Sequence, residues 1–249
     1  MAARSTGGIQ PVKPVMAHEL VLEQIRTAVA LGRYSDGDKL PRERDLAEML
    51  KVSRATVREA MAVLASCGEI EIRRGRNGGL IVRKVPVDEA VLRRNFRANR
   101  RKLQKIFEFR RVIESAGARL AAENRTKTDI AALRKLVREM QAVVDSDTAH
   151  DHATVARFQA LDHEFHLDVA SAGKNPWIVD ATSTARVEMF RPVGGVFRRL
   201  EPTANRLHEQ IFQAIVDTDG ESAGRWMAEH IEETRSLVDS WLRPSSRKS

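Results

Sequence analysis

Only one stretch of this 249-residue chain alternates between apolar and polar residues with the period of a β-strand. Ile70 and Ile72 alternate with charged neighbours, Leu80–Val82 forms a second short apolar run, and a Gly-rich turn at 74–79 separates them. This pattern predicts one β-hairpin. Elsewhere the apolar residues recur at helical spacing, so the fold class is mainly α.

Helices are expected on both sides of this hairpin. Before it, the pattern predicts helices over 17–31, 42–50 and 54–66, and Ser53 is a natural N-cap for the third. After it there is no further strand signal, and the apolar spacing indicates an antiparallel bundle of six or seven helices. The expected ranges are 87–97, 102–124, 127–145, 152–171, 175–191, 202–217 and 220–242.

The chain divides into segments of different character. A Gly/Pro-punctuated stretch begins the chain, the helix pair and hairpin follow, and a short Arg-rich helix leads into the bundle. The expected organisation is a mobile arm (1–15), a winged helix-turn-helix domain (16–85), a linker helix (86–102), a helical bundle domain (103–243) and a tail (244–249).

The positive charge is concentrated in the first two-fifths of the chain. Residues 1–101 contain 20 Lys/Arg and 12 Asp/Glu, whereas residues 102–249 contain 22 of each. A basic segment beside a neutral body favours a polyanionic partner for the N-terminal part. A single cysteine, Cys67, excludes an internal disulfide framework and Cys-rich metal sites. Without a signal peptide or a long apolar run, we expect a soluble, cytoplasmic protein and no membrane partner.

Two arginines share one face of the third expected helix. Arg54 and Arg58 are four residues apart near its N-terminal end, where the second helix of a helix-turn-helix reaches base edges. A guanidinium can bind guanine or phosphate with two hydrogen bonds. The alternative is a surface ion pair, because Glu43 and Glu59 are close in sequence.

Further candidates for DNA contact surround this helix. Arg42 and Arg44 begin the preceding helix, where phosphate contacts are expected, and Ser53 and Thr56 could donate to phosphate. The hairpin adds three more cations at its turn: Arg73, Arg74 and Arg76. Together with the tight turn between the helices, these residues favour a winged DNA-binding domain.

Residues 17–84 closely resemble the DNA-binding domain of the GntR superfamily of repressors. The resemblance rests on Leu40–Ala47 (LPRERDLA), Val52–Ala60 (VSRATVREA) and the turn Arg74–Gly79. It implies DNA contacts at Arg44, Ser53, Arg54, Arg58 and the wing tip Arg74-Gly75. Arg42 departs from the family pattern, which has a small residue there, and could add a phosphate contact.

Four residues of the helical part form a candidate metal site. Asp162 and His166 are four apart and therefore share a helix face, while His208 and His230 lie on two later helices. One carboxylate and three imidazoles would suit Zn²⁺, Ni²⁺ or Mn²⁺. From spacing alone, an ordinary Asp–His ion pair, with the other two histidines elsewhere, is the alternative.

Residues 103–242 look like the FCD effector domain of the FadR-type branch of the same superfamily. The resemblance rests on four stretches: Glu108–Glu114 continuing to Ala122, Asp162–His166, Ala170–Pro176 and His208–His230. It implies that Asp162, His166, His208 and His230 bind a divalent metal, zinc first, with nickel or manganese as alternatives. It also implies a small carboxylate effector.

Two residues are assigned to effector binding, Arg110 and Asn175. Arg110 could instead form an ion pair with Glu114, one helical turn away. In the stretch before Asn175, one residue more than the family's common form follows Ala172.

These features predict a homodimeric, ligand-responsive transcriptional regulator, a repressor by the family's commoner habit, that binds a pseudo-palindromic operator and is not an enzyme. One alternative is a metal-dependent hydrolase fused to a DNA-targeting module, for which Glu164 is the only candidate general base. Another is a non-specific DNA-compacting protein. A regulator should bind its operator at least ~10³-fold more tightly than random DNA, which separates it from the latter.

Overall fold

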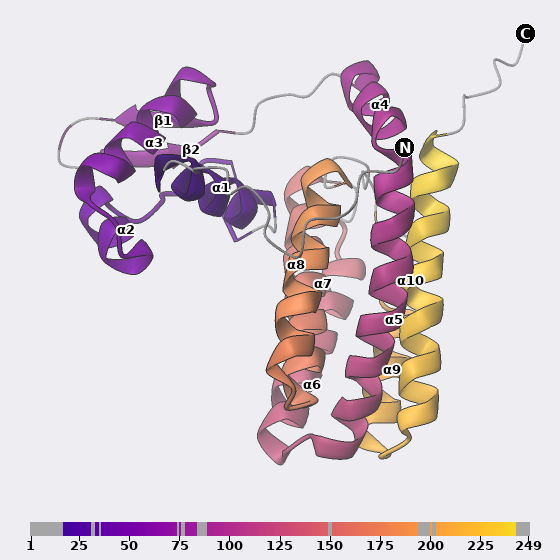
Figure 1. Cartoon of the computed structure of the whole chain (residues 1–249). Helices are drawn as coiled ribbons and strands as arrows, with labels where there is room; N and C mark the ends of the chain where they lie inside the picture. The colour runs from indigo at the N-terminus through magenta and orange to yellow at the C-terminus, as the bar shows by residue number, and fades with distance from the viewer. Residues whose placement is uncertain are drawn as a thin grey trace, which may run out of the picture. The chain divides into compact units, whose positions relative to one another are not determined.

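The computed structural model divides the chain into two compact units (Figure 1). We call them the winged unit (Met1–Arg26 and Asp36–Lys84) and the bundle unit (Thr27–Ser35 and Val85–Ser249). The structure describes residues 17–30, 33–34, 36–73, 75, 78–83, 89–148, 151–193, 200 and 203–242. The expected arm and tail lie outside these residues.

Within the described residues the structure contains ten helices and two strands, and it confirms the mainly α fold class with a hairpin after the helix-turn-helix. The first part of the chain forms α1 (Ala17–Ala30), α2 (Glu43–Leu50), α3 (Arg54–Ser66), β1 (Ile70–Arg73) and β2 (Gly79–Val82). The bundle helices are α4 (Glu89–Ala98), α5 (Arg100–Asn124), α6 (Lys127–Val144), α7 (His152–Ala172), α8 (Pro176–Val193), α9 (Arg206–Val216) and α10 (Gly220–Leu242).

The turn between α2 and α3 is short because local signals end one helix and begin the next. Lys51 adopts a left-handed conformation (φ 54°), and its backbone N–H bonds back to the last turn of α2. Two residues later, Ser53 caps α3. The buried face of α3 is Val57, Ala60, Met61 and Leu64, as the helical spacing predicts.

The hairpin packs against α3 through its first strand. β1 and β2 are antiparallel, with Ile70 opposite Val82 and Arg73 opposite Gly79. Ile70 is buried but Ile72 is 50% exposed, so only one end of β1 contributes to the core. The segment before α2 adds one bridge, between Lys39 and Ile81. The hairpin therefore closes the core and leaves its turn at the surface.

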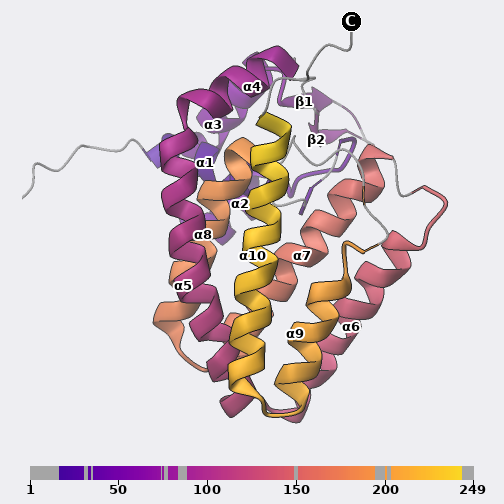
Figure 2. The ribbon, with the colours of Figure 1, turned by 90° about the vertical axis from the view of Figure 1, so that its right-hand side faces the viewer.

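The bundle unit is antiparallel and has a continuous apolar core. α5 packs along α10 and also contacts α7 and α8, while α6 packs against α7 and α9. Figure 2 shows α10 running between α5 and α9. Glycines allow the closest of these contacts, since a Cβ at Gly224 of α10 would lie 3.2 Å from the Ser115 carbonyl oxygen of α5. The core includes Phe107, Leu133, Met140, Phe165, Ile211 and Ile215.

The expected linker helix over 86–102 is interrupted in the structure. α4 ends at Ala98, Asn99 has φ −99° and ψ 8°, and α5 begins at Arg100. The sequence pattern also extended the ninth helix, expected from residue 202, which begins at Arg206 after a turn at 203–205. Such differences at helix ends are typical of prediction from periodicity.

Candidate DNA-contacting helix and metal centre

The N-terminal end of α3 presents exposed arginines. The backbone N–H of Thr56 donates to the Ser53 hydroxyl at 3.0 Å, which fixes where the helix starts. Arg54 and Arg58 are both exposed. The Arg58 Nε atom lies 3.5 Å from a Glu43 carboxylate oxygen, and 69% of the Arg58 side chain is exposed. The expected alternative ion pair is thus present, but pairs at such exposure contribute only ~0–1 kcal/mol and exchange easily for phosphate.

The preceding helix places two more arginines at the surface. Arg42 occupies the N-cap position of α2 without a side-chain cap, and Arg44 follows in the first turn. Arg44 Nε lies 3.3 Å from an Asp45 oxygen, and its side chain is 63% exposed. Ser53 and Thr56 share a hydrogen bond of 2.8 Å between their hydroxyl oxygens.

The hairpin turn is described only in part. Gly75 has φ +103°, a conformation that favours glycine, and its Cα faces open space. Arg74 and Arg76 lie outside the described residues. Arg73 lies on β1 and pairs with Glu71 at 2.7 Å, where hydrogen bonds from Arg73 and Arg83 lower the Glu71 pKa to about 2. Arg73 is therefore held along the strand.

The four candidate metal ligands converge inside the bundle. Asp162 and His166 come from α7, His208 from α9 and His230 from α10. One potential ligand atom from each lies within 4.8 Å of all the others. Separate elements thus bring together residues up to 68 positions apart in sequence. The alternative of histidines scattered over the bundle does not describe this structure.

The spacing of these atoms suits a coordinated ion. The Asp162 Oδ1 atom lies 3.0 Å from His208 Nε2, 3.6 Å from His166 Nε2 and 3.7 Å from His230 Nε2. His166 Nε2 and His230 Nε2 are 3.1 Å apart. Ligands about 2.0–2.1 Å from one ion lie roughly 2.8–3.0 Å apart at 90° and roughly 3.3–3.4 Å apart at the tetrahedral angle. Two of the four distances fall within these limits, and those from Asp162 Oδ1 to His166 and His230, at 3.6 and 3.7 Å, are slightly longer. The donor set of one oxygen and three nitrogens fits Zn²⁺, Ni²⁺ or Mn²⁺.

Electrostatics keep three of the four groups, Asp162, His208 and His230, in the forms that bind metal. Burial lowers the pKa of His208 and, together with the neighbouring histidines, that of His230, so both are neutral near pH 7. Burial alone would raise the Asp162 pKa, but the charge of Arg186 and the nearby histidines hold it well below its usual value. An ionised carboxylate beside neutral imidazoles needs no deprotonation before binding a cation.

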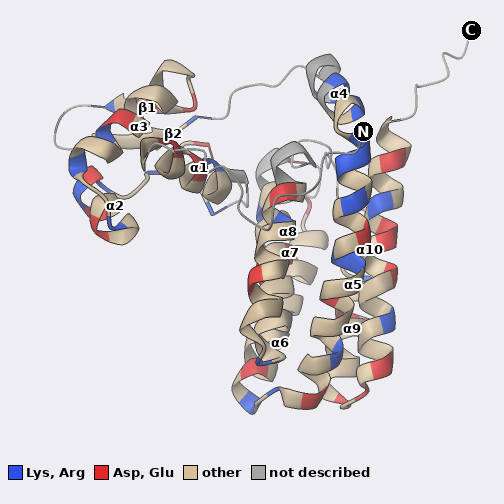
Figure 3. Ribbon diagram, viewed as in Figure 1, with Lys and Arg blue, Asp and Glu red and all other residues tan. Residues whose placement is uncertain are grey.

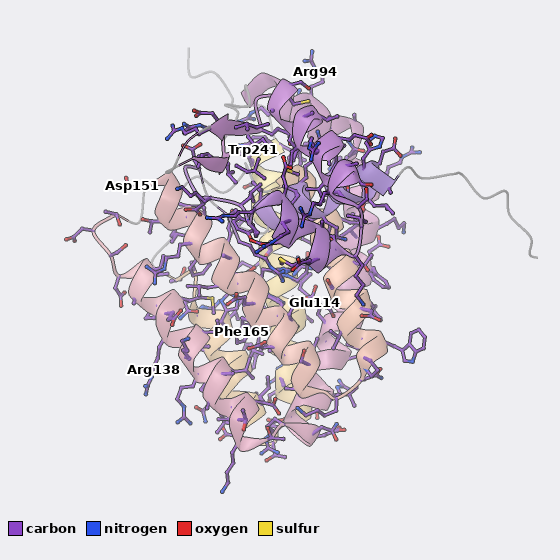
Figure 4. The ribbon with its side chains drawn as sticks, turned by 90° about the vertical axis from the view of Figure 1, so that its left-hand side faces the viewer. Arg94, Glu114, Arg138, Asp151, Phe165 and Trp241 are labelled. Atoms are coloured by element: carbon purple, nitrogen blue, oxygen red, sulfur yellow. The ribbon has the colours of Figure 1, made fainter. Side chains whose placement is uncertain are left out.

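A buried carboxylate from α5 orients one of the histidines. The Glu114 Oε2 atom lies 2.5 Å from His166 Nδ1, and Glu114 is 3% exposed. Arg110 Nε lies 2.5 Å from the other Glu114 oxygen. A carboxylate this close to Nδ1 holds the ring so that the other nitrogen, Nε2, faces the cluster. Figure 4 shows Glu114 and Phe165 in the interior of the bundle, and the Phe165 ring packs 5.0 Å from that of His208.

Arg186 of α8 is a site residue that the sequence reasoning missed. It is fully buried, pairs with Asp162 Oδ2, and donates through Nε to His163 Nδ1 at 3.1 Å. Burial and the charge of Arg186 lower the His163 pKa to about 3, so this histidine stays neutral. The feature that could have indicated its role is its position: Arg186 shares a helix face with Thr182 and Met189, which are both buried.

The two residues assigned to effector binding lie in different places. Arg110 is 1% exposed and pairs with Glu114, so the ion-pair alternative is present beside the cluster. Asn175 lies in the turn before α8, where its Oδ1 accepts the Trp177 backbone N–H at 3.1 Å. No contact among the described residues joins Asn175 to the four ligands, and its visible role is to start α8.

Two family models match the chain. The model for bacterial regulatory proteins of the gntR family matches residues 18–78. The FCD domain model matches residues 105–233, just over half of the chain. The chain belongs to the GntR family. Its FCD domain agrees with the FadR-type subgroup, and the family is one of DNA-binding transcriptional regulators, not of enzymes.

The GntR-family relatives match over nearly the whole chain. RmpR of Mycobacterium gastri, which carries the name of an HTH-type transcriptional regulator, is 30% identical over 92% of this chain and 85% of its own length. The Glc operon transcriptional activator of Escherichia coli is 27% identical over 86% of this chain and 85% of its own length. The solved structure of E. coli McbR/YncC covers 92% of this chain and 100% of that chain, with a TM-score of 0.55 and 19% identity, and so supports the fold alone.

In the part of the chain that the structure describes, no helix combines the length and the apolar character needed to cross a bilayer.

Proposed function

We propose that this GntR-family regulator is a ligand-responsive repressor that binds a pseudo-palindromic operator as a homodimer and senses a small organic acid through a bound divalent metal. In this proposal residues 16–85 bind DNA, residues 86–102 connect the two domains, and residues 103–243 bind the effector and form the dimer. The protein acts in the cytoplasm. The observation that carries the proposal is the convergence of Asp162, His166, His208 and His230 within a chain of this family.

On the DNA side, α3 reads bases and the surrounding cations bind phosphate. Arg54 and Arg58 are exposed at the start of α3, the end of a recognition helix that reaches the major groove. The loose surface pairing of Arg58 with Glu43 leaves the Arg58 guanidinium free to exchange partners. The remaining contacts in this proposal are Arg42, Arg44, Ser53, Thr56, Arg74, Gly75 and Arg76.

On the sensing side, the four ligands would hold the divalent ion, zinc first, with nickel or manganese as alternatives. When bound, the ion supplies a Lewis acid that polarises and anchors a carboxylate oxygen. Glu114 orients His166, and Arg186 holds Asp162 through its second oxygen. Both supports come from helices other than α7, so the ligand geometry is fixed by the packing of the bundle.

Charge balance favours an anionic effector. The buried charged groups around the cluster are two carboxylates, Asp162 and Glu114, and two guanidiniums, Arg110 and Arg186, which together sum to zero. The histidines His208 and His230 are neutral at pH 7. A divalent ion would therefore leave a buried excess of about two positive charges, which an organic acid could neutralise.

The dimer in this proposal uses the bundle unit. Phe109 and Val112 on α5 are 45% and 64% exposed, although both are large apolar residues. They are three positions apart and so lie together on one helix face. Apolar surface of this kind is commonly covered by a second copy in homodimers.

Replacing one ligand tests the sensing site without touching the DNA-binding face. We expect His208→Ala to lose metal in the purified protein by elemental analysis, and to lose stabilisation by added Zn²⁺, while binding an operator selected from random duplexes as the parent does. His18→Ala, a histidine in α1 paired with Glu59, is the matched control. Unchanged metal content in His208→Ala would overturn the site assignment.

A reporter gene behind the selected operator tests the direction of control. Repression is expected, with higher expression when the regulator gene is deleted. Lower expression on deletion would instead make this chain an activator, like the relative named for the Glc operon.

A further inference from the structure

A short basic segment at the start of the bundle unit carries charge that neither proposed site uses. Residues 89–105 contain seven Lys/Arg and one acidic residue. The whole of 17–84 contains thirteen Lys/Arg and ten acidic residues. Seventeen residues thus carry a net +6, twice the net charge of the winged helix-turn-helix. Figure 3 shows this basic colouring along α4 and the first turns of α5.

One side of α4 packs against the bundle, and this packing determines which of its side chains face solvent. Phe96 is fully buried and packs edge-on against the Trp241 ring of α10, with centroids 5.3 Å apart. Arg93 donates to the Trp241 carbonyl oxygen at 2.8 Å and lies 4.7 Å from the centre of that ring. Arg93 is therefore a structural arginine, and the side of α4 away from Trp241 faces solvent.

The arginines on the solvent side have no anionic neighbour. We call Arg94, Arg97, Arg100 and Arg101 the basic junction; all four are exposed. Among the described residues no ion pair or hydrogen bond reaches their guanidiniums. Figure 4 shows Arg94 projecting away from the ribbon. The next two cations differ, because Lys102 pairs with Glu188 and Lys105 lies 2.7 Å from Glu108.

The basic junction is unfavourable for the isolated protein. Arg100, Arg101 and Lys102 occupy the first turn of the 25-residue α5, which contains no acidic residue there. The N-terminal end of a helix carries a partial positive charge and favours acidic side chains. Like charges one helical turn apart, as at Arg94 and Arg97 of α4, repel as well. A polyanion bound across the junction would offset both effects.

We propose that the basic junction is a second DNA-contacting surface, which binds phosphates of the duplex beyond those contacted by the winged unit. Guanidiniums bind phosphate oxygens with two hydrogen bonds, and such contacts add affinity independent of sequence. The junction contributes salt-dependent affinity, while α3 provides base discrimination. This inference requires DNA binding by the family but neither the metal nor the effector.

The salt dependence of DNA binding by the full chain tests the proposal. The probe is a fluorescently labelled duplex of random sequence, titrated between about 50 and 200 mM NaCl. Each phosphate contact contributes about 0.9 to the slope of log affinity against log salt. We expect the combined change of Arg94, Arg97, Arg100 and Arg101 to Gln to reduce that slope by about 1 to 3.6. The ratio of operator to random affinity should stay constant.

Two further variants separate this role from general charge. The matched control replaces four exposed cations elsewhere on the bundle, Lys127, Arg134, Arg138 and Arg157, by Gln, and should leave the slope within about 0.5 of the parent. Replacing the junction arginines by Lys should keep the slope, because charge is kept. An unchanged slope in the Gln variant, or an equal loss in the control, would overturn the proposal. The proposal would also be overturned if the Gln variant lost binding to phosphatidylglycerol vesicles while its DNA affinity stayed unaltered.

Discussion

The arginines of the two candidate sites, the α3 face and the metal cluster, have opposite surroundings. In the winged unit, Arg58 is 69% exposed and its nearest carboxylate oxygen is 3.5 Å away. In the bundle unit, Arg110 and Arg186 are 1% and 0% exposed and pair with Glu114 and Asp162. The first kind of arginine can change partners at little cost, and the second kind cannot.

This difference indicates which unit is ready for a large anion and which for a small one. Exposed guanidiniums can bind duplex phosphates or base edges without breaking a buried ion pair, and binding to phosphate releases counterions from the DNA. The buried pair has already lost its water and is held by carboxylates, so it stabilises a fixed geometry around the histidines. The winged unit is thus suited to exchange of partners, and the bundle unit to a preformed site.

The comparison predicts its largest effect for loss of a buried arginine. Arg186→Ala should lower the free energy of unfolding of the bundle by about 3–5 kcal/mol, because Asp162 is left buried without its cation. All three tryptophans, Trp177, Trp226 and Trp241, belong to the bundle unit, so their fluorescence in a urea titration reports on that unit.

Arg58→Ala is the matched control, and its urea unfolding is followed by far-UV circular dichroism because all three tryptophans lie in the other unit. Because Arg58 is exposed, its loss should change the unfolding free energy by no more than about 0.5 kcal/mol. A similar loss of stability in the two variants would remove the distinction between the buried and the exposed arginines.

The reverse order is expected for DNA. Arg58→Ala should weaken operator binding by roughly 1–3 kcal/mol and relax base preference at one position, since a base contact is lost. Metal content should stay as in the parent. Anisotropy titrations with the operator and with single-base variants measure both effects, and Arg138→Ala on α6 is the control. Equal weakening on operator and random duplex would make Arg58 a phosphate contact.

Local signals were enough to predict most of the fold. Ser53 caps α3 as expected, and the predicted helices overlap the observed ones. These features depend on residues within one or two turns of each other. The gap expected between the helices at 87–97 and 102–124 is also observed, although it is only one residue long, Asn99, because α4 and α5 each extend further than the apolar pattern predicts.

The candidate site depended on information that spacing does not contain. The i,i+4 relation of Asp162 and His166 is local, but their meeting with His208 and His230 requires the packing of three helices. Residue type and spacing singled out the four ligands only as one of two interpretations, and the family resemblance then favoured the metal site over an ordinary Asp–His ion pair. Arg186 was missed, because sequence alone does not show that a lone charge on a helix faces inward.

The smallest expected effect concerns a surface cap of the bundle. Asp129 accepts the Thr126 backbone N–H at 2.7 Å and pairs with Lys174 at 2.7 Å; burial alone would raise its pKa, but these bonds lower it. The ionised form therefore stabilises the fold above pH 3.8, and this contribution is lost as pH falls through the folded-state pKa. Asp129→Asn should lower the free energy of unfolding by about 0.5–1 kcal/mol at pH 7 and by less at pH 3. Urea unfolding measures both values, and Asp180→Asn, at an exposed position, is the control. A deficit that does not shrink on acidification would show that the carboxylate charge contributes nothing.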